Sequence, residues 1–360
     1  MTARPPLIRR LRATVTRPRR TRVTLANFAI VTTATVTTGV VALLAEDMLP
    51  KPQDGSWFVL SRWITAVVLL VALVAALSFR AHVHRTTGTL FYVHALDEGM
   101  ADRQTEALAV AAERHMATRS ISRWTDLPDR TSPTGVIDVV DVCAEVGALL
   151  EQQINDDSQD TGYVVAPNLL WPMALSIGAY LPHTRTVRLL ELTTDWEISL
   201  TDTGSNIVEK QLEQARSAGP VGVWIALAPN AAHFNPNTFT AWGMSRWHIL
   251  TYPEGPPTRD QPCPHWTATQ LEQFPAALAD ALVSLKNTAR EEGRDLVVVA
   301  MMPKVVALAL GRQLALRECR FFTGTHLMHY DHTAGYLPMR VRPNQPTAMP
   351  TLVPDEPADA

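Results

Sequence analysis

The 360-residue sequence is poor in cysteine and lysine, with three cysteines and with lysine at only four of its 32 basic positions. The cysteines are isolated and odd in number, which excludes a disulfide framework and fits a reducing compartment. The sequence also lacks a P-loop, a G-x-S-x-G elbow and an H-E-x-x-H zinc motif. These absences favour binding over catalysis, and we expect no metal ion, no cofactor and no enzymatic activity.

Charge is unevenly distributed along the chain. Residues 1–85 carry 12 of the 32 basic residues but three of the 35 acidic ones, so residues 86–360 are strongly acidic. A domain that acidic is a poor general binder of DNA or RNA, because nucleic-acid polymers require a basic face. A small anionic ligand remains compatible with this composition, because a few local donors suffice to bind it.

Two apolar runs near the N-terminus predict a transmembrane hairpin at 23–80. Residues 23–45 carry no charge and, as a helix, would span roughly 34 Å, against a hydrocarbon core of about 30 Å. The second run covers residues 58–79, with Arg62 near its start. A cleaved signal peptide would have a shorter apolar region and would leave the second run unexplained. A buried helix of a soluble protein is the alternative for the second run.

The flanking charges predict how this hairpin is oriented. Residues 1–22 contain eight arginines and no acid, and Arg80 and Arg85 follow the second run. The loop between the runs holds three acids against Lys51. The positive-inside rule therefore predicts a multi-pass protein of the inner membrane with its N- and C-termini in the cytoplasm.

A strand–turn–helix unit occurs twice in the sequence, 133 residues apart. The copies share the pattern A-L-x-[IL]-G-x-x-L, which starts at Ala174 and again at Ala307. Each copy follows a short apolar strand, at 163–166 and at 297–300. A duplicated α/β unit of this kind predicts a pocket built between two similar halves.

Elements that flank the two copies also correspond. Strands at 90–95 and 223–228 each end 79 residues before their copy of the pattern. A long helix precedes each repeat strand, and a strand hairpin follows each repeat helix. This alternation predicts parallel α/β halves at about 88–200 and 221–342, with ligand bound at the carboxyl ends of the strands. Residues 202–218 are predicted to be helical, and the proline-rich, acidic tail at 343–360 to be disordered.

Two stretches of the sequence resemble a known family of domains. The closing stretch from Phe322 to Met339 and the strand–Pro–helix unit with Gly311 are similar to the SAVED domain, a fusion of two CARF-like, Rossmann-like units. The resemblance covers roughly residues 88–342 as a whole-domain pattern. SAVED domains sense cyclic oligonucleotides in CBASS anti-phage defence, and some of them follow two transmembrane helices.

The resemblance implies a fold and a function. The fold is an α/β chain in which an N-terminal two-helix transmembrane hairpin precedes a duplicated Rossmann-like (CARF-like) SAVED domain at 86–342. The function is that of a sensor–effector that binds a cyclic oligonucleotide second messenger and disrupts the inner membrane in abortive infection. The expected partners are therefore this ligand, the lipid bilayer and further copies of the chain, with no DNA or RNA polymer.

Four turns are expected to converge on the pocket, at 96–98, 167–168, 229–230 and 302–304. Lys304 opens a helix, where backbone N–H groups and the helix dipole favour phosphate, although it can equally be a solvated first-turn lysine. Asn168 can read a base edge or cap a helix. Aromatic residues can stack on bases or pack in the core. The candidate ligand-binding residues are Lys304, Pro303, Met302, Asn168, Trp171, Asn230, Phe234 and Tyr336.

The remaining motif is an H-x2-H-x2-H pattern at 326, 329 and 332. In a strand His326 and His329 would face opposite sides, so we expect no metal site there. Two rival functions stay open. One is a membrane-anchored nucleotide-processing hydrolase with a Rossmann-like domain, and the other is a scaffolding membrane protein without a small ligand.

Overall fold

The computed structural model describes residues 28, 30–32, 35, 38, 64–65, 67–78, 88–97, 100–114, 116–157, 162–182, 187–194, 196–200, 207–213, 219–228, 231, 234–242, 244, 246–253, 255, 268–317, 320–331 and 335–350. The described residues before position 79 are helical. The predicted spans at 23–45 and 58–79 lie largely outside these ranges. Within the ranges given, no helix has both the length and the apolar character needed to cross a membrane.

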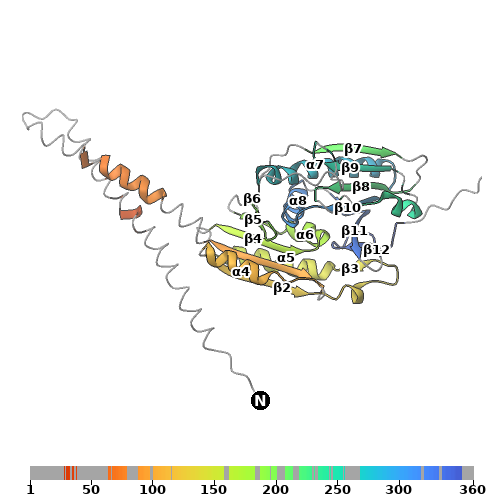
Figure 1. Ribbon diagram of the computed structural model, residues 1–360, viewed down its shortest axis with the longest axis horizontal. Coiled ribbons are helices and arrows are strands. Elements are labelled where there is room, and N and C mark those ends of the chain that lie inside the picture. Colours follow the sequence, from red (N-terminus) through yellow and green to blue (C-terminus); the bar gives the residue numbers. More distant parts are fainter. Residues whose placement is uncertain are drawn as a thin grey trace, which may run out of the picture. The chain divides into compact units, whose positions relative to one another are not determined.

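The first half of the remaining chain forms a five-stranded sheet in the order β2-β1-β4-β5-β6 (Figure 1). Strands β4 and β5 are parallel, and β5 and β6 form an antiparallel hairpin, as predicted. Its elements are β1 (Thr89–Leu96), α4 (Gln104–Glu113), β2 (Ala117–Trp124), η1 (Pro128–Arg130), α5 (Val140–Asn155), β4 (Tyr163–Leu169), α6 (Trp171–Gly178), β5 (Val187–Glu191) and β6 (Trp196–Ser199).

The second half forms a seven-stranded sheet in the order β3-β12-β11-β10-β8-β9-β7. Strands β9, β8, β10 and β11 run parallel, and β11 and β12 form the predicted closing hairpin. Its elements are β3 (Ile137–Asp138), β7 (Val208–Glu213), β8 (Val221–Ala226), η3 (Pro236–Trp242), β9 (Arg246–Thr251), α7 (Ala268–Glu291), β10 (Leu296–Met301), α8 (Lys304–Leu316), β11 (Thr325–Asp331) and β12 (Gly335–Arg340).

The two sheets repeat one arrangement of strands. The order β2-β1-β4-β5-β6 of the first sheet recurs as β9-β8-β10-β11-β12 in the second. The central strands β4 and β10 are apolar and almost wholly buried, as is typical of parallel strands covered on both faces. The prediction of parallel α/β halves is confirmed for the central strands, but the sheets are mixed because antiparallel pairs lie toward their edges. The strand order fits a Rossmann-like duplication.

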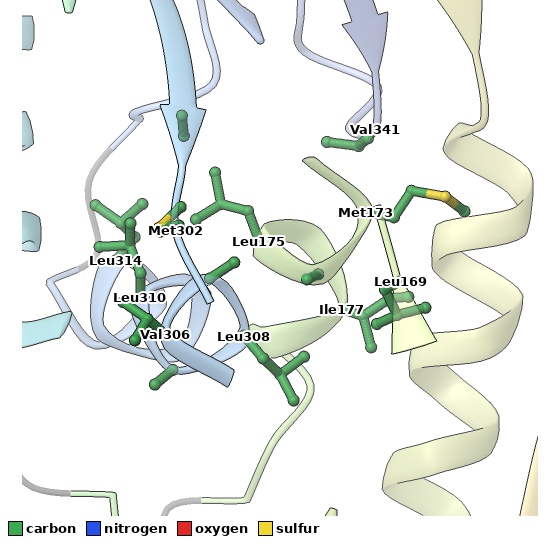
Figure 2. Packing of buried hydrophobic residues seen from close by; sticks show 14 of the residues in the cluster. Leu169, Met173, Leu175, Ile177, Met302, Val306, Leu308, Leu310, Leu314 and Val341 are labelled. Atoms are coloured by element: carbon green, nitrogen blue, oxygen red, sulfur yellow. The ribbon is translucent and has the colours of Figure 1, made fainter. Parts of the chain in front are cut away.

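Helices α6 and α8 pack against each other between the two sheets, and the repeated glycines make this packing close. A Cβ atom on Gly178 would lie 2.0 Å from the carbonyl oxygen of Leu308, and one on Gly311 would lie 2.0 Å from that of Leu175. Leu175 and Leu308 occupy the same position of the repeated pattern, so the contact is reciprocal. Figure 2 shows both leucines in the buried cluster formed by the two helices. The repeat therefore specifies the interface that joins the halves.

Three segments differ from the sequence-based expectation. Residues 208–213 form the edge strand β7, paired with β9, so the helix predicted at 202–218 is wrong there. The polar side chains of β7 suit an exposed edge strand. A polar sequence pattern also fits the surface of a helix, so the pattern did not distinguish the two structures. Strand β3 lies within the predicted first half (88–200) but pairs with β12 of the second half, so the boundary between the halves is not the boundary between the sheets. At this pairing Arg340 donates to Asp138.

The third difference concerns the C-terminal segment. Gln345 is buried, and its side-chain oxygen accepts hydrogen bonds from the backbone N–H groups of Val341 and Arg342. The Thr347 carbonyl accepts from the Thr134 hydroxyl. Residues 343–350 are therefore ordered, and the disorder predicted from Pro343 onward is wrong for them. The disorder was predicted from the proline and acidic content of the whole stretch 343–360, whose acidic residues all follow position 350, so composition did not reveal the buried glutamine.

Candidate ligand-binding site

A cavity of about 840 Å³ lies where the carboxyl ends of β10 and β11 meet the start of α6. This is the sheet edge at which parallel α/β proteins bind ligands. Both halves contribute to its wall, as the duplication predicts. The first half supplies 169–171, and the second supplies Asn235, Thr238, 299–302, Lys304, 328–330, Gly335 and Tyr336.

Among the described residues that line this cavity, Lys304 is the one lysine. It begins α8, directly after the N-cap residue Pro303, and its ammonium group donates to the Asn168 side-chain oxygen at 2.5 Å. Burial lowers the pKa of Lys304, an effect that the nearby Glu191 carboxylate opposes. The side chain is therefore a partly desolvated cation held in place by the other half of the domain.

The amino terminus of α8 is already occupied by a carboxylate of the protein. The backbone N–H of Val305 donates to Glu191 at 3.4 Å, and Glu191 is buried at the end of β5. The backbone N–H groups of Val306 and Ala307 donate to the Pro303 carbonyl. The expectation that this terminus offers free N–H groups to a phosphate is wrong for these three residues. The positive charge at this end of α8 comes instead from the Lys304 side chain.

Asn168 neither caps a helix nor faces the cavity. It belongs to β4 and is buried, and the N-cap residue of α6 is Leu170. Its amide nitrogen donates to the Tyr92 hydroxyl and to the Ala101 carbonyl, each at 3.0 Å, while its oxygen accepts from Lys304. The predicted capping role is therefore wrong, and contact of Asn168 with a base edge stays a prediction. Asn168 instead positions Lys304, because its hydrogen bonds fix the amide in one orientation.

Behind Asn168 the polar network continues into the first half. The Tyr92 hydroxyl donates to Asp102 at 2.7 Å and lies 3.0 Å from Nδ1 of His94. Burial, followed by the bond to Asp102, raises the pKa of Tyr92 to about 12. Burial lowers the pKa of His94. This network links Lys304 to Tyr92 and His94 of β1. It was not expected from the sequence, because Asn168 and Lys304 are far in the chain from Tyr92.

Aromatic side chains form the other wall of the cavity. Tyr336 and Tyr330 lie edge to face, with ring centroids 5.1 Å apart, and Tyr330 is 50% exposed. Burial raises the pKa of Tyr336 to about 12. Phe234 stacks on Trp224 at 4.5 Å and meets Tyr336 at 6.2 Å, inside a buried cluster. Phe234 therefore supports Tyr336 from within the core and does not line the cavity.

Of the other candidate residues, some line the cavity and some do not. Met302 and Trp171 line the cavity, and Pro303 lies next to them without being part of the wall. Asn230 lies outside the described residues. The structure adds Met301, Met328, His329 and Tyr330, which follow from applying the strand-end rule to β10 and β11. His326 faces Asp295 at 3.4 Å, at the opposite end of β11. Within the described ranges, no group of three metal-ligating side chains occurs.

Comparison with known proteins gives structural similarity alone. No family model matches the chain, and no curated protein matches it. Three solved structures of the SAVED/CARF-domain containing receptor Cap4 from Acinetobacter baumannii are similar. The receptor without a named ligand has a TM-score of 0.40 and 12% identity, and covers 80% of this chain and 61% of its own.

The other two structures hold cyclic trinucleotides. The receptor with 2′3′3′-cAAA has a TM-score of 0.39 and 11% identity, and the receptor with 3′3′3′-cAAA has 0.42 and 13%. Each covers 76% of this chain and 55% of its own length. The chain thus spans little more than half of these receptors. At this level of similarity, the function has to be argued from the cavity itself.

Proposed function

We propose that the domain is a sensor that binds a cyclic oligonucleotide in the 840 Å³ cavity. The observation that carries the proposal is the make-up of the cavity, in which one half of the domain supplies Trp171 and the other supplies Lys304, Tyr330 and Tyr336. Nucleobases stack on aromatic side chains, and a phosphodiester pairs with an ammonium group. The volume lies within the usual range for small-molecule sites, and no polymer is required to fill it.

Lys304 is the residue to which we assign the phosphate contact. Its hydrogen bond to Asn168 holds the ammonium group beside the cavity, and its partial burial makes a charge-assisted bond stronger than it would be in water. The tyrosine pair and Trp171 take the bases. A ligand that contacts all of these residues touches both halves at once, so its binding depends on their relative position.

We further propose that the output of this sensor is at the inner membrane. The support is the pair of apolar runs with basic outer flanks. Within the second run, the helical residues Val67, Val68, Leu70, Val71, Val74 and Leu77 are between 47% and 63% exposed. An apolar helix surface of this kind is suited to lipid or to another copy of the hairpin. Ligand then has to favour the assembled, membrane-disrupting state over the free one.

The test is a titration of the full chain in non-ionic detergent with cyclic di- and trinucleotides. We expect saturable binding of at least one of them, and Lys304→Ala to weaken it by roughly tenfold or more, as for the loss of a hydrogen bond to a charged group. Lys210→Ala is the matched control, because Lys210 lies on the edge strand β7, away from the cavity. Absence of binding by every candidate ligand would sink the proposal.

The same titration addresses the hydrolase alternative. The reaction mixture is analysed for cleaved ligand after binding has reached equilibrium. Intact ligand is the expected result for a sensor. Turnover of ligand in excess over protein would instead establish a nucleotide-processing enzyme.

A further inference from the structure

A second cavity, of about 340 Å³, lies at the opposite end of the second sheet. Its wall includes Asp295 and Gly324, which immediately precede β10 and β11. These strands are parallel, so their amino ends share one edge. A six-residue strand spans about 20 Å, which separates this cavity from the one beside Lys304. The two cavities are therefore separate, and one small ligand does not fill both.

Four basic side chains converge on this cavity. Lys286 and Arg290 lie one turn apart on α7, Arg294 follows the same helix, and Arg320 precedes the turn before β11. The clustering is not a consequence of composition, because residues 86–360 hold 20 of the 32 basic residues but 32 of the 35 acidic ones. A concave basic site in an acidic domain indicates an anionic ligand.

Only part of this positive charge is neutralised within the described residues. Arg294 pairs with Glu292 at 3.1 Å and donates to the Gly219 carbonyl. Asp295 faces His326 and lies close to Lys286. Arg290 and Arg320 are exposed and form no ion pair with any residue that the structure describes. Two guanidinium groups are thus available to a ligand at the mouth of the cavity.

Lys286 is held in the wall of the cavity by a specific contact. Its ammonium group donates to the Gly324 carbonyl at 2.8 Å, and Gly324 has a positive φ of 62°. Burial lowers the pKa of Lys286, the nearby Asp295 carboxylate opposes this shift, and the positive charge of Arg290 adds to it. An anion bound here would offset both lowering effects, because it stabilises the charged amine. Val283 and Phe321 add an apolar part to the wall.

We propose that this second cavity binds a phosphate group carried by a small molecule. Guanidinium groups recognise phosphate with two parallel hydrogen bonds, and a lysine adds a point charge. The volume is at the lower end of small-molecule sites, which suits a phosphorylated metabolite or a lipid headgroup. The site shares no residue with the cavity beside Lys304, so it adds a second input to the domain independently of the cyclic nucleotide.

The experiment is calorimetric titration of the full chain in non-ionic detergent with pyrophosphate and with glycerophosphoglycerol, the deacylated headgroup of an anionic phospholipid. We expect one saturable site for at least one probe. Arg290→Gln and Arg320→Gln should each weaken it by roughly tenfold, since each removes hydrogen bonds to a charged group. The tighter probe identifies the source, a terminal phosphate or a phosphodiester headgroup.

Two controls separate this site from general charge and from the first cavity. Lys210→Gln removes one positive charge on β7, and Lys304→Ala alters the first cavity, so both should leave pyrophosphate binding unchanged. The two arginine variants affect exposed side chains, and unchanged melting temperatures would show that they fold. No saturable binding of either probe, or equal losses in Lys210→Gln, would overturn the proposal. Neither result bears on the proposed cyclic-nucleotide sensor, because that proposal rests on the first cavity, which shares no lining residue with the second.

Discussion

Helices α6 and α8 occupy equivalent places in the two halves, and a shift of 133 residues superimposes the start of β4 on that of β10 and the start of α6 on that of α8. The residues that pack the helices together are the same in both copies, with Gly178 matching Gly311. The residues near the cavity differ between the two copies. Trp171 corresponds to Lys304, and Asn168 to Met301.

The difference continues along the neighbouring strands. Tyr92 and His94 of β1 correspond by the same shift to Ile225 and Leu227, which are fully buried apolar residues. The first half thus carries a buried polar network that the second half replaces by hydrocarbon. Packing is shared because both copies face the same interface, whereas the polar groups differ between the copies, as the proposed ligand site with unlike contacts requires. Substitutions can therefore disrupt the shared packing or make the unlike polar residues of the two halves more similar.

The largest effect is expected from the shared glycines. In Gly178→Ala and Gly311→Ala the new methyl group meets a backbone carbonyl at 2.0 Å, and backbone in a helix cannot move aside. We expect each to lower the free energy of unfolding by about 3 kcal/mol or more, at the upper end of the cost of overpacking. Urea denaturation measures it, and equal losses for both variants would confirm the reciprocal contact.

Gly293→Ala is the matched control for these glycines. Gly293 has a positive φ of 67°, but a Cβ atom there meets nothing within 4 Å. Its expected cost is about 1 kcal/mol, from backbone strain alone. If the helix glycines cost no more than this control, the two helices do not pack as closely as described.

The second effect concerns the network that only the first half has. Asn168→Ala removes the acceptor of Lys304 and the amide that donates to Tyr92. We expect a loss of about 2 kcal/mol in the free energy of unfolding, because buried polar groups lose their partners. Asn155→Ala, at the exposed end of α5, should change it by less than about 0.5 kcal/mol. Similar values for both variants would show that the network contributes nothing.

How much of this arrangement the sequence could predict depends on the distance over which its residues interact. Lys304 and Trp171 were predicted because the repeat and the strand-end rule are local patterns. The partners of Lys304 were not, because Asn168 and Glu191 are brought to it only by the packing of α6 on α8. Strand β7 was mistaken for a helix because its pairing with β9 decides its structure. Phe234 was placed in the site because a buried and a ligand-facing aromatic look alike in sequence.

The third prediction distinguishes the unlike contacts at the starts of the two helices. Trp171→Ala should weaken cyclic-nucleotide binding by roughly tenfold, since loss of one stacking contact costs about 1–3 kcal/mol. This loss should persist at high salt. The loss caused by Lys304→Ala should shrink as salt rises, because salt screens the charge that is removed.

The control for the stacking residue is Trp124→Ala, since Trp124 is exposed and does not line the cavity. Titrations at low and high salt provide the comparison for all three variants. If Trp171→Ala and Lys304→Ala show the same salt dependence, the two halves do not contribute different chemistry, and the division of roles between them is wrong.

The smallest effect is expected at acid pH and again separates the halves. Burial depresses the pKa of His94 in the folded state below its ordinary value of 6.5, with Lys304 adding to the shift and Asp102 opposing it. Below pH 6.5 the unfolded chain therefore binds a proton that the folded chain does not. Stability should fall as pH drops from 6.5 to the folded pKa, by at most about 1.4 kcal/mol per pH unit. His94→Leu introduces the residue found at the equivalent position of the second half, Leu227. It should remove the pH dependence of the free energy of unfolding, measured by denaturation at roughly pH 5 to 7. An unchanged slope in His94→Leu would mean that another group, outside this network, controls the acid sensitivity.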